Sequence, residues 1–149
     1  MNTPIMVKNS CITFYKEGVQ FRLQSKGLLK EWIMKIITNE GKTAAPISFI
    51  FCTDEKLFEI NLKYLKTSEL TDVITFDYGD PNTVSGDVFI SFDRVIENAN
   101  AFKVSFNNEL RRVMVHGTLH LAGFSDKTKQ EKAEMTRKED LYLSLFPLK

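Results

Sequence analysis

Two histidines and one aspartate have the types and the spacing of metal ligands. His116 and His120 are the only histidines of the 149-residue chain and stand four positions apart. On an α-helix, residues i and i+4 lie on one face, so both imidazoles can reach one ion. A turn at the helix-ending Gly123 can bring Asp126 back toward the two rings. Three such ligands predict a site for one zinc ion per chain with an open coordination position.

The alternative is that the two histidines are incidental polar residues on a helix edge. The pattern H-x-x-x-H-x-x-G-x-x-D favours a metal site, because it combines helical spacing, a chain reversal and a third ligand, as in metzincin proteases. A bound zinc would lower the pKa of a coordinated water to about 7 and polarise a phosphoryl or carbonyl oxygen. We therefore expect a catalytic role for His116, with a metal-bound water as the nucleophile.

The residue after the first histidine argues against one class of enzyme. Zinc proteases of the HExxH type place a glutamate there as the general base, and this chain has Gly117. Glycine at that position would instead allow another helix or a substrate to approach closely. A zinc hydrolase of peptides or small esters remains the alternative enzyme class.

The metal ligands need a helix over about residues 107–122 to position them. Its apolar residues recur every three or four positions and predict a buried stripe of Leu110, Val113, Met114, Gly117 and Leu121. At 100° per residue, His116 and His120 fall on the edge of that stripe. They should be neither fully solvated nor in the middle of the core.

The remaining patterns predict an α/β (α+β) fold. Strands are expected at 11–15, 47–52, 73–76 and 87–91, and helices at 25–40, 54–65 and 93–103 and from residue 128. Pro46 bounds the second strand and Asp54 caps the helix after it. Thr128 and Glu131 form a capping box, after which Met135, Tyr142 and Leu145 face the core. We expect a single domain, 1–149, with a small four-stranded, mostly parallel sheet, one antiparallel strand, and about five helices covering its faces.

Composition narrows the class of protein. The chain is 43% hydrophobic and has a formal net charge of +1, unlike proteins that bind duplex nucleic acid mainly by charge. No apolar run approaches the ~20 residues of a membrane span, and the amino terminus does not resemble a signal peptide. Cys11 and Cys52 lack metal-ligand spacing and are expected to be structural thiols. These features predict a cytoplasmic protein with no membrane partner.

Three ordered motifs between residues 47 and 145 resemble the YbeY family of bacterial endoribonucleases and ribosomal RNA maturation factors. They are residues 116–123 (HGTLHLAG), residues 71–76 (TDVITF) preceded by Asn61 and Tyr64, and residues 86–91 (GDVFIS), while Met135 and Glu139 are similar to the family's C-terminal helix.

The resemblance implies a small α/β metalloprotein with one zinc ion that cleaves single-stranded RNA. It also implies a role in maturing the 3′ end of small-subunit ribosomal RNA and in ribosome quality control. The implied partners are a ribosomal RNA precursor and the ribosome or its small subunit. By the same resemblance, His116 and His120 match two zinc ligands, and Asp126 stands where family members usually have a third histidine.

A second departure from the family concerns RNA binding. Family members usually carry an arginine that is thought to help bind or cleave RNA, and here its position holds Leu65. Lys63 and Lys66 flank it and are our candidates for substrate binding, although an ammonium cannot form the bidentate contact of a guanidinium with a phosphate. We expect Thr71 and Asp72 to fix the entry of the following strand through side chain–backbone hydrogen bonds rather than to contact substrate.

Basic residues also crowd the segment after Asp126. They would either carry an RNA backbone or form a solvated helix face; they are Lys127, Lys129, Lys132, Arg137 and Lys138. A non-catalytic, ribosome-associated protein with a structural metal is the third possible function, because Leu65 replaces the family's arginine and the net charge is near zero.

Overall fold

The computed structural model describes residues 11–65 and 71–147, apart from the side chain of Leu65. Its sheet has four strands in the order β1-β2-β4-β3. They are β1 (Ile12–Glu17), β2 (Thr43–Cys52), β3 (Val73–Asp77) and β4 (Thr83–Ser91). β1, β2 and β4 are parallel, and β3 pairs with β4 in the antiparallel sense. The predicted fold class is confirmed.

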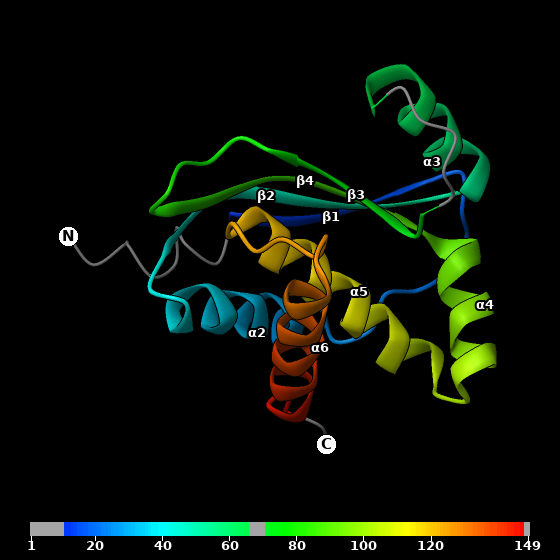
Figure 1. Cartoon of the computed structure of the whole chain (residues 1–149). Helices are drawn as coiled ribbons and strands as arrows, with labels where there is room; N and C mark the ends of the chain where they lie inside the picture. Colours follow the sequence, from blue (N-terminus) through cyan, green and yellow to red (C-terminus); the bar gives the residue numbers. More distant parts are fainter. Residues whose placement is uncertain (1–10, 66–70, 148–149) are drawn as a thin grey trace.

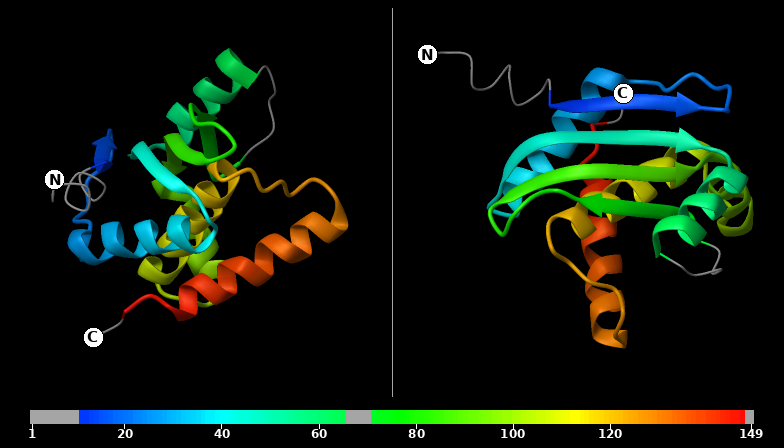
Figure 2. Two further views of the ribbon diagram at one scale, coloured as in Figure 1. Left: turned by 90° about the vertical axis from the view of Figure 1, so that its left-hand side faces the viewer. Right: turned by 90° about the horizontal axis from the view of Figure 1, so that it is seen from above.

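The helices cover the two faces of the sheet unevenly. They are α2 (Lys26–Asn39), α3 (Asp54–Ile60), the π-helix η1 (Asn61–Leu65), α4 (Phe92–Phe102), α5 (Phe106–Leu121) and α6 (Lys129–Ser144). In Figure 1, α2, α5 and α6 lie below the sheet, whereas α3 lies above one end of it. The view from above in Figure 2 leaves most of the other face uncovered by helices. Within the described ranges, no helix has the length and apolarity to cross a membrane.

The strand β2 begins earlier than predicted, because Pro46 lies within it rather than before it. Ala44 pairs with Val84 and Ile47 with Gly86, so β2 has one more residue than β4 between these pairs. Proline has no N–H to donate and is tolerated in a sheet at such a bulge. The Pro46 carbonyl accepts a hydrogen bond from Ser85 Oγ at 2.7 Å.

Two predicted details of the helices are wrong. Thr53, not Asp54, caps α3: its Oγ1 accepts a hydrogen bond from Lys56 N at 3.0 Å. Leu145 is 59% exposed, because α6 ends at Ser144. The next aromatic residue, Phe146, is buried instead and packs edge-on against Trp32.

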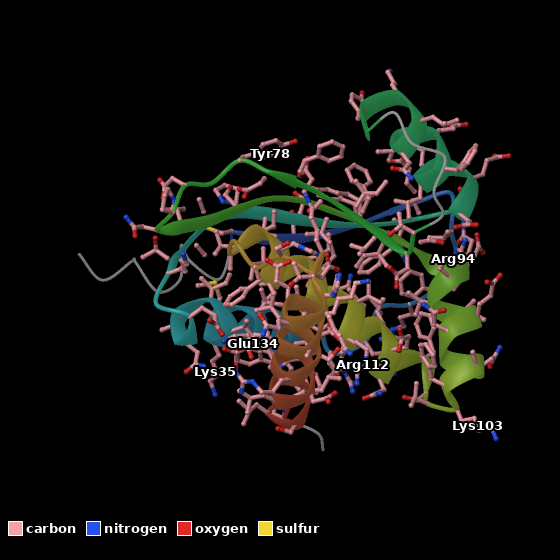
Figure 3. All side chains as sticks on the ribbon, in the orientation of Figure 1. Lys35, Tyr78, Arg94, Lys103, Arg112 and Glu134 are labelled. Carbon is pink, nitrogen blue, oxygen red and sulfur yellow. The ribbon has the colours of Figure 1, made fainter. Side chains whose placement is uncertain are left out.

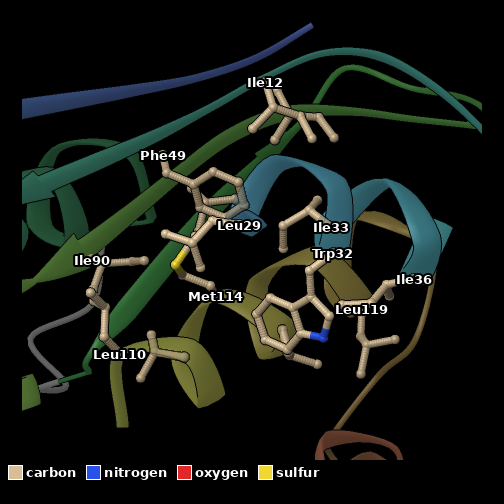
Figure 4. Packing of buried hydrophobic residues seen from close by; sticks show 14 of the residues in the cluster. Ile12, Leu29, Trp32, Ile33, Ile36, Phe49, Ile90, Leu110, Met114 and Leu119 are labelled. Atoms are coloured by element: carbon tan, nitrogen blue, oxygen red, sulfur yellow. The ribbon is translucent and has the colours of Figure 1, made fainter. Parts of the chain in front are cut away.

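The main core fills the space between the sheet and the helices below it. Figure 4 shows Phe49 of β2, Trp32 of α2 and Met114 and Leu119 of α5 facing one another there. The Trp32 indole donates to the Tyr142 carbonyl at 2.8 Å and so ties α2 to α6. This core packs α5, the helix that carries both histidines, against the sheet.

The two cysteines behave as the sequence predicts. Neither Cys11 nor Cys52 forms a disulfide. Cys52 is fully buried, and burial, with a smaller contribution from the charge of Glu17, raises the pKa of its thiol to about 12. A thiol of this kind is unreactive near neutral pH.

Gly117 lets α5 approach the sheet closely. A Cβ atom at this position would lie 2.6 Å from Val88 Cγ1, well inside van der Waals contact. Val88 belongs to β4 and has no exposed surface. The close neighbour of Gly117 is therefore the sheet, not another helix or a substrate, and a glutamate has no room there.

We expect Gly117→Ala to lower the free energy of unfolding by up to about 2 kcal/mol. Overpacking a rigid, β-branched neighbour costs about 1–3 kcal/mol, while alanine recovers up to about 1 kcal/mol of helix propensity. Urea unfolding would measure the difference. Gly27→Ala in α2 is the matched control, because no atom lies within 4 Å of its new Cβ. Equal stability of the two variants would contradict the packing argument.

Candidate metal centre

Three ligand atoms converge where α5 ends. His116 Nε2 and His120 Nε2 are 3.0 Å apart, and Asp126 Oδ2 lies 3.3 Å and 3.4 Å from them. In a tetrahedral zinc site with metal–ligand distances of about 2.0–2.1 Å, neighbouring ligand atoms are about 3.3 Å apart. Among the described histidine, cysteine, aspartate and glutamate side chains, these three form the group close enough to share a metal ion.

The hydrogen-bond partners of the two imidazoles direct the Nε2 lone pairs toward the point where the three atoms converge. His116 Nδ1 is 2.6 Å from Glu139 Oε2, and His120 Nδ1 is 3.0 Å from the Phe124 carbonyl. A carboxylate and a carbonyl can only accept, so each Nδ1 carries a hydrogen and the inward Nε2 atoms are left to bind a metal. Three acceptor atoms this close repel one another unless a proton or a cation lies between them. The donor set therefore fits zinc.

The end of α5 is built to hold His120. Gly123 adopts a positive φ of 102°, which glycine reaches without strain. Gly123 N donates to the His120 carbonyl and Phe124 N to the Leu119 carbonyl, both at 3.0 Å. This is a Schellman motif. It turns the chain so that the Phe124 carbonyl faces the His120 ring.

The start of α6 fixes the other end of the turn. Glu131 N donates to Thr128 Oγ1 at 3.0 Å, and Thr128 N donates to Glu131 Oε1 at 2.9 Å. The predicted capping box is confirmed. With both ends held, the short segment between α5 and α6 presents Asp126 to the two imidazoles.

Glu139 of α6 is a supporting residue whose role the sequence did not reveal. Its carboxylate is buried, bonds His116 through one oxygen, and accepts from Arg112 Nη1 through the other at 3.0 Å. The available signal was its place between Met135 and Tyr142 on the inward face of α6. A carboxylate on such a face needs a polar partner.

The surroundings shift the pKa values of the two histidines in opposite directions. Burial lowers the pKa of His116, but the hydrogen bond and the charge of Glu139 outweigh it, so that the pKa is raised. Burial and the neighbouring His116 lower the pKa of His120. A metal ion bound here would therefore compete with a proton chiefly at His116.

We expect Glu139→Gln to weaken zinc binding by about 10- to 100-fold, the usual effect of removing such a partner. If the amide NH₂ faces His116, it donates to Nδ1 and forces the hydrogen onto Nε2. If it faces Arg112, two donors meet. Competition with a chromophoric chelator would measure the affinity.

The matched control is Glu134→Gln. Glu134 pairs with Arg137 on the surface of α6, on the side away from Arg112 (Figure 3). Unchanged zinc affinity in Glu139→Gln would mean that Glu139 does not support a ligand.

A cleft of about 380 Å³ opens beside the three ligand residues. His116 and Asp126 are among its lining residues, and the other walls come from α4, α5, α6 and the residue before β3, Asp72. This volume is within the range of small-molecule binding sites. The cleft gives a ligand access to the place where the three ligand atoms converge.

The basic residues predicted for RNA binding are distributed unevenly around this cleft. Of the cluster after Asp126, Lys132 lines the cleft, whereas Lys138 pairs with Glu40 at 2.9 Å and Arg137 pairs with Glu134. Lys63 lies on η1 over the Tyr64 ring and is not among the cleft residues. Lys66 lies outside the described residues, so substrate binding by either lysine stays a prediction.

The two residues before β3 have different environments. Thr71 Oγ1 donates to the Val73 carbonyl at 3.1 Å, which is the structural role predicted for it. Asp72 lines the cleft, and its carboxylate accepts from Asn98 Nδ2 at 3.4 Å. The predicted side chain–backbone bond is thus found for Thr71, whereas the Asp72 side chain bonds the side chain of Asn98 on α4.

The comparisons with known proteins point to one family. The profile described as endoribonuclease YbeY matches residues 12–146. A protein named endoribonuclease YbeY from Christiangramia forsetii is 47% identical over 91% of this chain and 94% of its own. One from Flavobacterium psychrophilum is 44% identical over 88% of this chain and 94% of its own.

A solved structure supports the same conclusion. The solution structure of a Thermotoga maritima protein aligns with a TM-score of 0.63 at 28% identity, over 89% of this chain and 87% of that one. Sequence, fold and the histidine motif point the same way, and the chain belongs to the endoribonuclease YbeY family.

Proposed function

We propose that this protein is a zinc-dependent endoribonuclease that cleaves single-stranded RNA. The observation that carries the proposal is the convergence of His116, His120 and Asp126 beside an open cleft, in a chain whose relatives are named endoribonucleases. We further propose that the single domain acts in the cytoplasm on a ribosomal RNA precursor. There it would mature the 3′ end of small-subunit ribosomal RNA and serve ribosome quality control in contact with the ribosome.

His116, His120 and Asp126 would hold one zinc ion. When bound, zinc supplies a Lewis acid for a phosphate oxygen and lowers the pKa of a water toward 7. The chain's own residues do the positioning: Glu139 and the Phe124 carbonyl keep the Nε2 atoms directed inward. Lys132, on the cleft wall, would balance the charge of an RNA phosphate.

The geometry favours this proposal over the two alternatives. A protease of the HExxH type needs a glutamate where Gly117 packs on Val88, and none fits there. A structural zinc site usually has four protein ligands and is closed. Here the described structure brings three together, and the Asp126 side chain is 36% exposed beside the cleft. An open position of this kind is typical of a catalytic site.

The test compares one RNA sequence as a single strand and as a duplex. We expect protein freed of metal by a chelator to cleave neither, and zinc addition to restore cleavage of the single strand. Elemental analysis should find one zinc per chain. Cleavage that survives complete removal of metal would contradict the proposal, and ribosome binding without any cleavage would favour a structural metal.

A further inference from the structure

Glu109 is a buried carboxylate in the cleft that the metal centre does not use. It lies on α5 two turns before His116 and lines the same cleft. Its side chain is nearly inaccessible, with 3% of the residue exposed. Its Oε1 atom has no hydrogen-bond partner among the described residues.

The surroundings of Glu109 do not compensate for its burial. Arg112, the cation whose charge acts on Glu109, is engaged by Glu139 and Asp140 at 3.0 Å each. Burial raises the pKa of Glu109; Arg112 lowers it in part, and Asp72 and Glu139 raise it further. An acceptor left unpaired in this way destabilises the folded protein unless a ligand pairs with it.

The rest of the cleft has the features of a nucleobase site. Phe102, at the end of α4, lines the cleft and is 62% exposed, so its ring is available for stacking. Val113 and Met135 are apolar residues that also line the cleft. Single-stranded RNA is commonly read by stacking a base on an aromatic ring while its edge is hydrogen-bonded.

We propose that Glu109 reads a guanine base of the RNA substrate, with Phe102 as the stacking surface. A carboxylate only accepts hydrogen bonds, and the Watson–Crick edge of guanine offers two adjacent donors, N1–H and the 2-amino group. Adenine and cytosine place an acceptor beside their amino group, which would oppose the second carboxylate oxygen. Uracil offers one donor between two acceptors. The inference rests on the proposed function, because a base in this cleft places its strand next to the metal centre.

The experiment uses zinc-loaded full-length protein and uridine oligoribonucleotides with one central guanosine, inosine or adenosine. We expect kcat/KM to favour guanosine over adenosine by about 10- to 100-fold, the usual value of a bidentate base contact. Inosine, which lacks the 2-amino group, should fall between them. A parallel titration measures binding of guanosine and adenosine monophosphates without cleavage.

The diagnostic variant is Glu109→Gln. It should reduce the guanosine preference to less than about threefold and leave zinc affinity unchanged. Its Tm should equal or exceed that of the wild type, because a buried unpaired charge is removed. Phe102→Ala should weaken the binding of all the oligonucleotides while keeping the guanosine preference. The surface variant Glu134→Gln should change neither the binding nor the preference.

The outcomes separate this inference from the proposed function. Equal kcat/KM values for guanosine and adenosine in an active wild type would overturn the inference and leave the proposed function standing. An unchanged guanosine preference in Glu109→Gln would do the same. A Glu109→Gln protein that fails to fold would assign the carboxylate to folding and overturn it too. Tighter, Glu109-dependent binding of guanosine monophosphate by a protein that cleaves no RNA would uphold the inference and reject the proposed function.

Discussion

In the His120→Ala variant, stoichiometric zinc binding should be lost and RNA cleavage should fall about 10³-fold or more. Structural zinc sites bind with about 10–16 kcal/mol over four ligands, so one ligand contributes roughly 3 kcal/mol, or a factor of about 10²–10³ in affinity. The remaining pair, His116 and Asp126, would hold the ion too weakly to keep it at micromolar zinc. Elemental analysis and single-strand cleavage assays measure the two losses.

His120 is a cleaner position for this test than His116. The Nδ1 atom of His120 bonds a backbone carbonyl in a half-buried turn, so alanine there should cost about 1 kcal/mol of stability. Removing His116 would also leave the buried Glu139 without one of its two partners. The His120→Ala protein should therefore remain folded, as circular dichroism can show. Full zinc occupancy in that folded protein would place the ion elsewhere.

The parts of the site that the sequence predicts depend on short-range geometry. His116 and His120 share a helix face because they are four positions apart, and Gly123 reverses the chain because it tolerates a positive φ. The capping box joins Thr128 to Glu131, three positions on. Each of these signals involves neighbouring residues on the chain, so no knowledge of the tertiary packing is needed to read it.

The parts that the sequence does not predict depend on contacts between distant segments. Glu139 bonds a histidine 23 positions earlier in the chain, and Val88 is the neighbour that requires Gly117. Helical periodicity shows that such residues face inward, but it does not show which partner they meet. The cleft position of Glu109 has the same cause. The bulge at Pro46 also needed the register of β4, which no pattern within β2 contains.

Two replacements of Asp126 should distinguish the effect of losing the third ligand from the effect of changing its type. We expect Asp126→Ala to weaken zinc binding by about 10²–10³-fold, the loss of one ligand. Asp126→His should instead retain zinc or bind it more tightly, because imidazole is a good zinc ligand. In both side chains a ligand atom is two bonds from Cβ: Oδ2 in aspartate and Nδ1 in histidine. The partial exposure of Asp126 leaves room for the larger ring.

The same exchange should alter the chemistry of the bound ion. A neutral imidazole in place of a carboxylate leaves the site one unit more positive, which favours ionisation of a zinc-bound water. The rising limb of the pH–rate profile for RNA cleavage should therefore move to lower pH in Asp126→His than in the wild type. Chelator competition and the pH profile test the two expectations separately. If Asp126→His loses zinc as Asp126→Ala does, the turn after Gly123 cannot direct an imidazole at the ion. If neither variant loses zinc, Asp126 is not a ligand, and the open site rests on His116 and His120 with a third ligand still to be found.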